Sequence, residues 1–193
     1  MNQIKLEQTK IKVKQVLNPK RYEHTLGVMY TAGALAMRYH EDMYNALFAG
    51  LLHDCAKGFP ESACLSLCNS FRIPITEVER KNPGLLHAKL GARLAEREYG
   101  IMDAYITDAI ACHTTGRPNM TLLDKIIYVA DYMEPNRYEA PNLDEIRRIA
   151  FEDIDECLYT ILESTVAYLK QKDAVIDPMT EETYLYYKKE LNK

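Results

Sequence analysis

The stretch Ala49-Gly50-Leu51-Leu52-His53-Asp54-Cys55-Ala56-Lys57 places two adjacent ionisable side chains at the end of a run that is apolar enough to belong to a core. An unpaired carboxylate inside a core costs several kcal/mol, so such a group normally has a partner or a cation. Similar contexts hold three more histidines and one aspartate, which are His24, His87, His113 and Asp131. The sequence therefore predicts a buried metal centre.

Apolar residues recur three to four positions apart on both sides of this stretch, and alternating strand patterns are almost absent. We therefore predict an all-α fold. Thr76 with Glu79, and Thr121 with Asp124, mark two helix starts. The expected helices are a surface helix from Ile4 to Lys14, then Tyr22 to Met37, Asp42 to His53, Glu61 to Phe71, a short helix after Thr76, Leu85 to Gly100, Asp103 to His113, Leu122 to Met133, Asp144 to Lys170 and Thr180 to Leu191.

Length and composition limit the class of protein. With 193 residues we expect a single domain over 1–193, in which the helices of 144–191 pack on the part that carries the ligand candidates. A net charge of -4 argues against a surface for nucleic acid polymers. No apolar run approaches the roughly 20 residues that cross a bilayer, and no secretory signal is visible. Five cysteines without a CxxC pair fit a reducing compartment. We expect a cytoplasmic protein that does not bind membranes.

The ligand candidates come from five separate segments, and they comprise His24, His53, Asp54, His87, His113 and Asp131. A lone histidine on an apolar face is more often an ordinary core residue, but here only His40 reads as solvated surface. Imidazole and carboxylate suit Fe, Mn, Co or Zn. Six ligands exceed what one tetrahedral ion requires, which is compatible with two ions bridged by a carboxylate, and Asp54 is the better bridging candidate. The count alone does not fix one ion or two.

Phosphate recognition needs cations or backbone donors, and candidates adjoin these segments. Lys57 follows Asp54 by about one helical turn, and its alternative role is a solvated lysine. Arg21 and Arg137 can each hold a phosphate bidentately or can form surface ion pairs. No GxxxxGK[ST] loop is present, which argues against a P-loop nucleotide site.

Other polar residues near the predicted helix ends have two readings each. Thr114, Thr115 and Gly116 can donate to phosphate or can simply end a helix. Tyr132 can stack on a base or can pack in the core. Glu134 is read in the first place as a solvated carboxylate at a helix end, and in the second as a general acid or a residue behind the ligands.

The ordered segments resemble the H…HD…D signature of the HD-domain metal-dependent phosphohydrolases, and more closely the YqeK-like symmetrical diadenosine-tetraphosphate hydrolases. An HD pair alone is a weak motif, whereas five ordered segments are specific. A weaker echo follows at Asp177-Pro178-Met179-Thr180, where the family pattern has His at the first position. The five segments are Arg21-Tyr22-Glu23-His24, Leu52-His53-Asp54-Cys55-Ala56-Lys57, His87-Ala88-Lys89-Leu90-Gly91-Ala92, His113-Thr114-Thr115-Gly116 and Ala130-Asp131-Tyr132-Met133-Glu134-Pro135-Asn136-Arg137.

The resemblance implies a compact helical HD-domain fold, a divalent metal cofactor, in the first place two iron ions with Mn, Co or Zn as alternatives, and hydrolysis of diadenosine tetraphosphate to two ADP. Asp54 and Lys57 would be catalytic. One ion would be held by His24, His53, Asp54 and Asp131, while Asp54 is shared and His87 and His113 complete the second.

Two other functions stay open at this point. One is an HD phosphohydrolase for another nucleotide, such as a nucleoside mono- or triphosphate or an alarmone. The other is a non-catalytic sensor that binds a metal or a nucleotide. The predicted helix from Asp144 to Lys170 can bury its apolar face in the chain's own core or in the partner of a homodimer.

Overall fold

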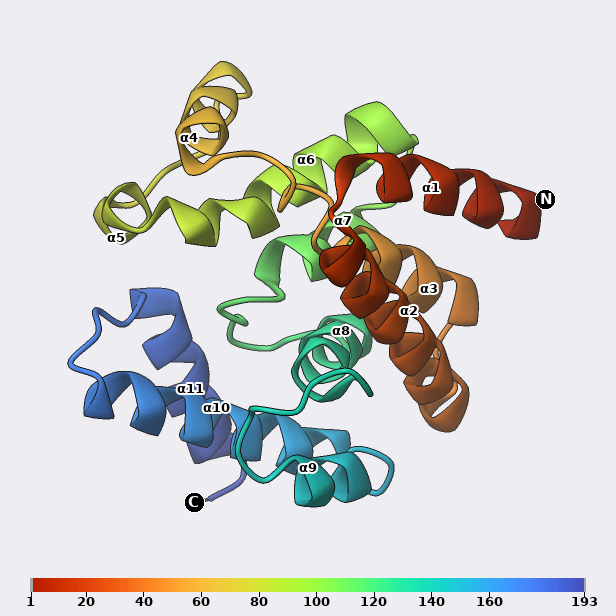
Figure 1. The fold of residues 1–193 in the computed structure, drawn as a ribbon. Helices are drawn as coiled ribbons and strands as arrows, with labels where there is room; N and C mark the ends of the chain where they lie inside the picture. Colours follow the sequence, from red (N-terminus) through yellow and green to blue (C-terminus); the bar gives the residue numbers. More distant parts are fainter. Residues whose placement is uncertain (1, 193) are drawn as a thin grey trace.

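The computed structural model describes residues 2–192, and this part of the chain contains helices and no strand (Figure 1). The predicted all-α class is confirmed. The helices are α1 Asn2–Val16, α2 Pro19–Tyr39, α3 Met43–Leu52, α4 Glu61–Ser70, α5 Glu77–Lys81, the short 3₁₀ helix η1 Pro83–Leu86, α6 His87–Tyr99, α7 Ala104–Cys112, α8 Leu122–Met133, α9 Leu143–Ile149, α10 Ile154–Gln171 and α11 Pro178–Glu190.

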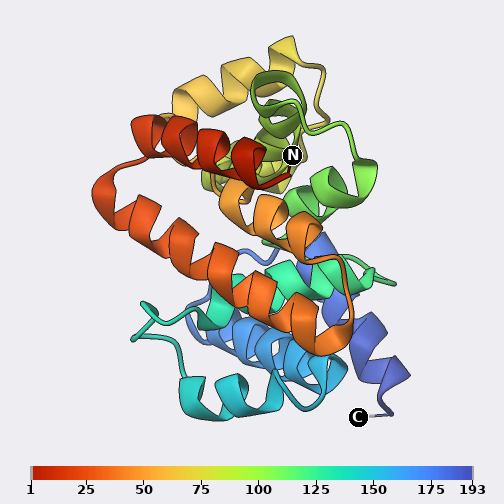
Figure 2. The same ribbon diagram turned by 90° about the vertical axis from the view of Figure 1, so that its right-hand side faces the viewer.

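Helix α8 lies at the centre of the molecule. It packs against α2, α3 and α7 on one side and against α9 and α10 on the other. Figures 1 and 2 show the helices α4–α6 at one end of the molecule and α9–α11 at the other, with the chain termini toward opposite ends. Because it packs against helices on both sides, α8 is mostly apolar and largely buried, with Leu123, Ile126, Ile127 and Val129 fully inside.

Side-chain caps fix where several of these helices begin. Thr76 and Glu79 form the predicted capping box, and Thr121 caps α8 as predicted. Helix α2 begins three residues before the predicted Tyr22, because the Asn18 side chain accepts a hydrogen bond from the Arg21 amide and Pro19 occupies the first turn. This early start places the first turn of α2 beside the ligand candidates.

The predicted continuous helix from Asp144 to Lys170 is wrong, because the chain breaks between α9 and α10. Asp153 has extended backbone angles (φ -145°, ψ 109°), and its carboxylate accepts hydrogen bonds from the amides of Asp155 and Glu156. A cap of this kind starts a new helix and ends the register of the previous one. The apolar face of α10 lies in the core against α8 and α11, so the chain itself covers that face.

Three further predictions concern the state of the cysteines, the exposure of His40 and the absence of a membrane-spanning helix. Cys55, Cys64, Cys68, Cys112 and Cys157 are all free and buried. His40 is exposed at the left-handed C-cap of α2, as predicted for a surface residue. Among the helices of residues 2–192, none combines the length and the apolar character needed to span a bilayer.

Candidate metal centre

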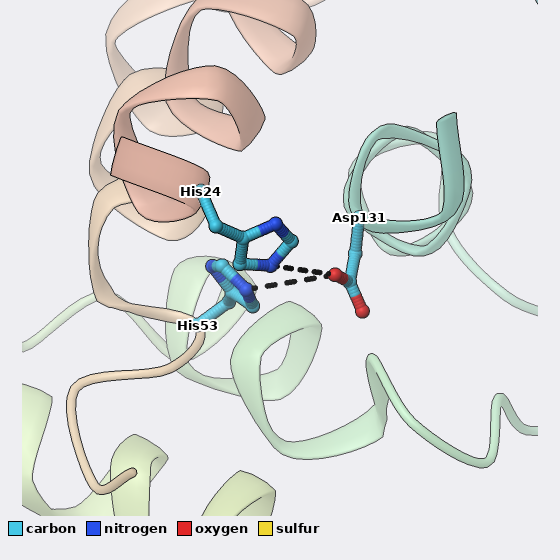
Figure 3. Close-up of side chains that lie close together, drawn as sticks. All are labelled: His24, His53 and Asp131. Carbon is cyan, nitrogen blue, oxygen red and sulfur yellow. Dashed lines mark ion pairs between the residues drawn. The ribbon is translucent and has the colours of Figure 1, made fainter. Parts of the chain in front are cut away.

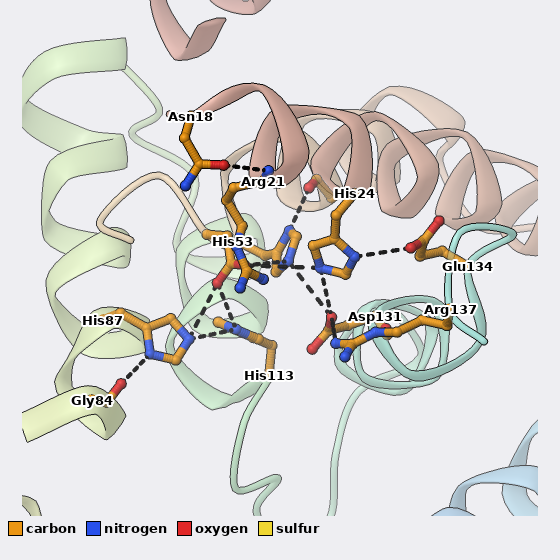
Figure 4. Close-up of polar contacts among 12 residues, drawn as sticks. Asn18, Arg21, His24, His53, Gly84, His87, His113, Asp131, Glu134 and Arg137 are labelled. Atoms are coloured by element: carbon orange, nitrogen blue, oxygen red, sulfur yellow. Dashed lines mark hydrogen bonds and ion pairs between the residues drawn. The ribbon is translucent and has the colours of Figure 1, made fainter. Parts of the chain in front are cut away.

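The fold brings all six ligand candidates into one buried cluster. Figure 3 shows His24, His53 and Asp131, and Figure 4 adds His87 and His113. His24 comes from α2 and Asp131 from α8, while the other four lie at helix ends. His53 and Asp54 follow α3, His87 opens α6, and His113 follows α7. Neighbouring imidazoles meet edge to face, with ring centroids 5.0 to 5.4 Å apart.

Three of the histidines are oriented by the backbone in the same way. The Nδ1 atoms of His53, His87 and His113 lie 2.7, 2.5 and 2.7 Å from the carbonyl oxygens of Gly50, Gly84 and Ile110, each three residues earlier. Carbonyls in a last helical turn lack an amide partner. Because a carbonyl only accepts, Nδ1 carries the proton and Nε2 keeps its lone pair for a ligand.

The fourth histidine is oriented by a carboxylate. His24 Nδ1 lies 3.0 Å from Glu134 Oε1, and Glu134 Oε2 accepts a hydrogen bond from the Asn136 amide at 2.7 Å. Glu134 is only 1% exposed, so its interpretation as a solvated helix-end carboxylate is wrong. Pro135 disfavours a helical conformation at Glu134, so α8 ends at Met133 and the turn directs the carboxylate toward α2.

Asp54 stands between two groups of imidazoles. Its Oδ2 lies 3.4 Å from His53 Nε2 and 3.8 Å from His24 Nε2. Its Oδ1 lies 3.3 Å from His87 Nε2 and 3.8 Å from His113 Nε2. On the first side, Asp131 Oδ1 lies 3.0 Å from His24 Nε2 and 3.8 Å from His53 Nε2 (Figure 3). One oxygen of Asp54 therefore faces each group.

The donor set fits a divalent cation. Among residues 2–192, the buried Nε2 atoms of His24 and His53 have no hydrogen-bond partner, although carboxylate oxygens lie close by. A buried polar atom without a partner is costly. The ligand atoms of two triads each lie within 4.8 Å of one another, and the triads are His24 with His53 and Asp131, and His53 with Asp54 and His113. The Nε2 lone pairs of His24 and His53 and the nearby carboxylate oxygens could therefore bind one cation lying between them.

The electrostatics favour the protonation state of a metal ligand at His87, His113 and Asp54. At His53 they do not, since burial opposes protonation but the adjacent Asp54 carboxylate raises the pKa of the imidazole. Burial lowers the pKa of His87 to about 3, with a further contribution from His113. Burial and the neighbouring His53 also lower the pKa of His113. Although burial opposes ionisation, the adjacent His53 holds the pKa of Asp54 well below its usual range. Neutral imidazoles and ionised carboxylates are the forms that bind a metal.

Two arginines lie on the carboxylates of the cluster. Arg21 Nη1 is 2.8 Å from Asp54 Oδ2, and Arg137 Nη2 is 3.0 Å from Asp131 Oδ1 (Figure 4). Both arginines line a cavity of about 740 Å³ that reaches His24. The cavity opens beside the metal candidates, and its walls also include Lys20 and Tyr138.

The other predicted substrate contacts lie around the cluster, and their roles stay predictions. Lys57 is exposed, and its charge contributes to the low pKa of His87. Thr114, Thr115 and Gly116 are the residues directly after His113, where Gly116 has a left-handed φ of 66° and its amide donates to Cys112. Tyr132 packs against the core, and its hydroxyl lies 3.5 Å from the Pro141 carbonyl.

The deviating motif near the C-terminus has a structural role. Asp177 caps α11, and its side chain accepts a hydrogen bond from the Met179 amide. An aspartate is among the preferred residues at this position, so the Asp in place of His serves the helix start.

Comparison with known proteins identifies the family. Residues 21–136 match the HD domain. The chain is 44% identical over 172 residues to the symmetrical bis(5'-nucleosyl)-tetraphosphatase of Bacillus subtilis (strain 168), covering 89% of this chain and 91% of the relative. It is 35% identical over 184 residues to the protein of the same name from Staphylococcus aureus, covering 94% of each.

A solved structure agrees with this similarity. The crystal structure of a predicted HD superfamily hydrolase involved in NAD metabolism, from Clostridium acetobutylicum, superposes with a TM-score of 0.92 at 38% identity. The match covers 95% of this chain and 97% of that one. These findings confirm the resemblance that the ordered histidine and aspartate segments indicated, and the chain belongs to the HD-domain family of hydrolases.

Proposed function

We propose that this protein hydrolyses diadenosine tetraphosphate symmetrically to two ADP at a centre that holds two divalent metal ions. The names of the relatives support the substrate. The observation that carries the metal centre is the position of Asp54, whose two oxygens face two different groups of histidines. His24, His53 and Asp131 would be the other ligands of the first ion. His87 and His113 would be the other ligands of the second ion.

The residues of the chain prepare the site before substrate arrives. Backbone carbonyls and Glu134 hold the imidazoles in the tautomer that directs Nε2 inward. A divalent cation, when bound, supplies a water of pKa lowered from about 16 toward about 7 and positive charge beside the phosphoryl oxygens. With one oxygen toward each group of histidines, Asp54 would be the residue that both ions share.

The polyphosphate chain needs positive charge at the entrance, and the arginines supply it. Arg21 and Arg137 are partly exposed, line the 740 Å³ cavity and at present lie on the ligand carboxylates. If these carboxylates served as metal ligands, both guanidinium groups would be free to hold phosphate oxygens bidentately. Lys57 and the segment Thr114, Thr115 and Gly116 are proposed as phosphate contacts from the side of His87 and His113, and Tyr132 as a contact of the base.

The proposal also covers the metal, the location and the oligomeric state. Iron is the proposed metal because neutral imidazole and carboxylate without thiolate suit it, while Mn, Co and Zn accept the same ligands. A cytoplasmic location is supported by the five free, buried cysteines. A homodimer is not needed to cover α10, whose apolar face is already in the core.

One observation favours a second candidate function. The similar structure from Clostridium acetobutylicum is described as involved in NAD metabolism. A different nucleotide would use the same metal ligands and differ only in what the cavity accepts. The alternative is therefore hydrolysis of another phosphoester at the same centre.

A substrate panel with product analysis tests the proposal. Protein loaded with Fe²⁺ without oxygen is given diadenosine tetraphosphate, nucleoside mono- and triphosphates and an alarmone. We expect the highest kcat/KM with diadenosine tetraphosphate and ADP as its product. In Asp54→Asn the kcat/KM should fall by more than about 100-fold, since removing a metal ligand costs more than removing the hydrogen-bond partner of a ligand. Asp108→Asn is the matched control, since Asp108 is exposed, pairs with Arg117 and is not among the ligand candidates. A higher kcat/KM with another nucleotide would contradict the proposed substrate. Unchanged turnover in Asp54→Asn would contradict the proposed metal centre.

A further inference from the structure

The turn after α8 makes two contacts to the cluster and one hydrogen bond within itself. Glu134 reaches His24, the Asn136 amide donates to Glu134, and Arg137 reaches Asp131. The Arg137 amide donates to the Glu134 carbonyl at 2.9 Å, which closes a turn with Pro135 at its second position. The orientation of His24 therefore depends on where this turn sits.

Arg147, on α9, holds the turn by its backbone. Its Nε donates to the Met133 carbonyl at 3.0 Å, and its Nη2 donates to the carbonyls of Glu134 and Arg137 at 3.1 and 2.9 Å. The Met133 carbonyl is in the last turn of α8, where no amide of the helix reaches it, and the Glu134 carbonyl accepts from Arg147 as well as from the Arg137 amide. A guanidinium group offers several donors in one rigid plane, so one side chain satisfies three acceptors. Its charge also suits the negative end of the α8 dipole.

The space beside Glu134 leaves it little freedom. A Cβ atom at Gly27 of α2 would overlap Glu134 Oε2. The carboxylate is therefore wedged against the α2 backbone, with one oxygen on His24 and the other on the Asn136 amide. Both carboxylate oxygens are engaged, so a shift of the turn would lengthen the contact with His24.

We propose that Arg147 is a positioning residue for the metal site on the His24 side, and that it acts through Glu134. The inference rests on the proposed centre of two metal ions. Arg147 lies beyond residues 21–136, which match the HD domain. Helix α9 thereby has a role in the site, although none of its side chains belongs to the cluster.

The structure predicts an effect on one ion and not on the other. His24 is the histidine whose Nδ1 faces a carboxylate, and an anionic acceptor makes its Nε2 a stronger ligand. His87 and His113 are oriented by carbonyls of Gly84 and Ile110, which Arg147 does not contact. A shift of the turn should therefore weaken the ion near His24 and leave the ion near His87 and His113 unchanged.

The test is a calorimetric titration of metal-free full-length protein with Mn²⁺. We expect two binding events in the unaltered protein. Arg147→Met and Glu134→Gln should each weaken one of them by about 10- to 100-fold and leave the other unchanged. Arg148→Met is the matched control, since Arg148 is the next residue, is exposed and pairs with Glu152. It should bind both ions as the unaltered protein does. Arg147→Lys, which keeps the charge and loses the planar group, should fall between Arg147→Met and the unaltered protein.

A double variant separates positioning from general stability. If Arg147 acts through Glu134, Arg147→Met with Glu134→Gln should weaken the ion no more than Glu134→Gln alone. Additive losses, equal weakening of both ions, or a lower Tm with both affinities unchanged would overturn the proposal. The titration contains no nucleotide, so it does not depend on the proposed substrate. A single binding event in the unaltered protein would instead contradict the two-ion centre itself.

Discussion

Gly27 shows how a single missing side chain shapes the site. Glycine inside a helix normally costs about 1 kcal/mol relative to alanine. At this position the cost is offset by function, since a Cβ atom would overlap the Glu134 carboxylate. The residue is needed for the contact between α2 and the turn after α8.

Gly27→Ala should therefore displace Glu134 from His24. Alanine normally stabilises a helix relative to glycine, but here the added methyl group should cancel that gain in stability, because overpacking costs about 1 to 3 kcal/mol. We expect Mn²⁺ affinity at one position to fall by about 10-fold or more, measured by calorimetry. Gly33→Ala in the same helix is the control, because its Cβ atom would meet the apolar side chain of Leu47 instead. Equal affinities in the two variants would contradict this account of Gly27.

The sequence could reveal residues by type and context but not by backbone contacts. The histidines and aspartates were visible because ionisable groups in apolar runs are rare. Glu134 was misread because only the turn at Pro135 sends its side chain inward. Arg147 acts by donating to backbone carbonyls, and Gly27 by having no side chain where Glu134 lies. Neither role leaves a pattern in the sequence. The Glu134-Pro135 pair was the one usable signal, since a residue before proline tends to leave the helix.

At the scale of elements, the caps predicted helix starts, while periodicity predicted the helical class but missed one break between helices. Thr76 and Thr121 marked helix starts correctly. The error came at α9 and α10, where buried apolar residues continue at a helical spacing across the break, as Ile146, Ala150, Ile154 and Cys157. Periodicity reports which face is buried and not whether the backbone is continuous. The capping side chain of Asp153 was the signal of the break.

Asp153→Ala should destabilise the protein by about 1 kcal/mol, because two amides at the start of α10 lose their acceptor. Denaturant unfolding followed by circular dichroism measures the change. Glu152→Ala is the control, because the Glu152 carboxylate is 60% exposed and pairs only at the surface with Arg148. Its effect should stay below about 0.5 kcal/mol. A loss in Asp153→Ala no larger than in the control would mean that the cap does not stabilise α10.

At the scale of the whole molecule, the packing of the helices protects every thiol. Burial raises the pKa of Cys68 to about 11 and that of Cys157 to about 12. The reactive thiolate is therefore scarce near neutral pH. A protein whose metal ligands are imidazole and carboxylate has no need of these sulfur atoms.

Native protein should react with less than about one equivalent of a chromogenic disulfide reagent at pH 8, because a raised pKa and burial both limit attack. After unfolding in guanidinium chloride, all 5 cysteines should react. Absorbance of the released thiolate measures both states. Fast reaction of several thiols in the native protein would show that the helices do not enclose them as the structure indicates.

The central claim is tested most directly by hydrolysing diadenosine tetraphosphate in H₂¹⁸O with the Fe²⁺-loaded protein. The products are separated, and their masses are determined by mass spectrometry. Attack of water on one of the two inner phosphorus atoms, with cleavage of the central P–O–P bridge, gives two ADP molecules and labels one of them. We therefore expect ADP alone, half of it carrying one ¹⁸O. AMP with ATP, or ADP without label, would contradict symmetrical cleavage by water at this centre.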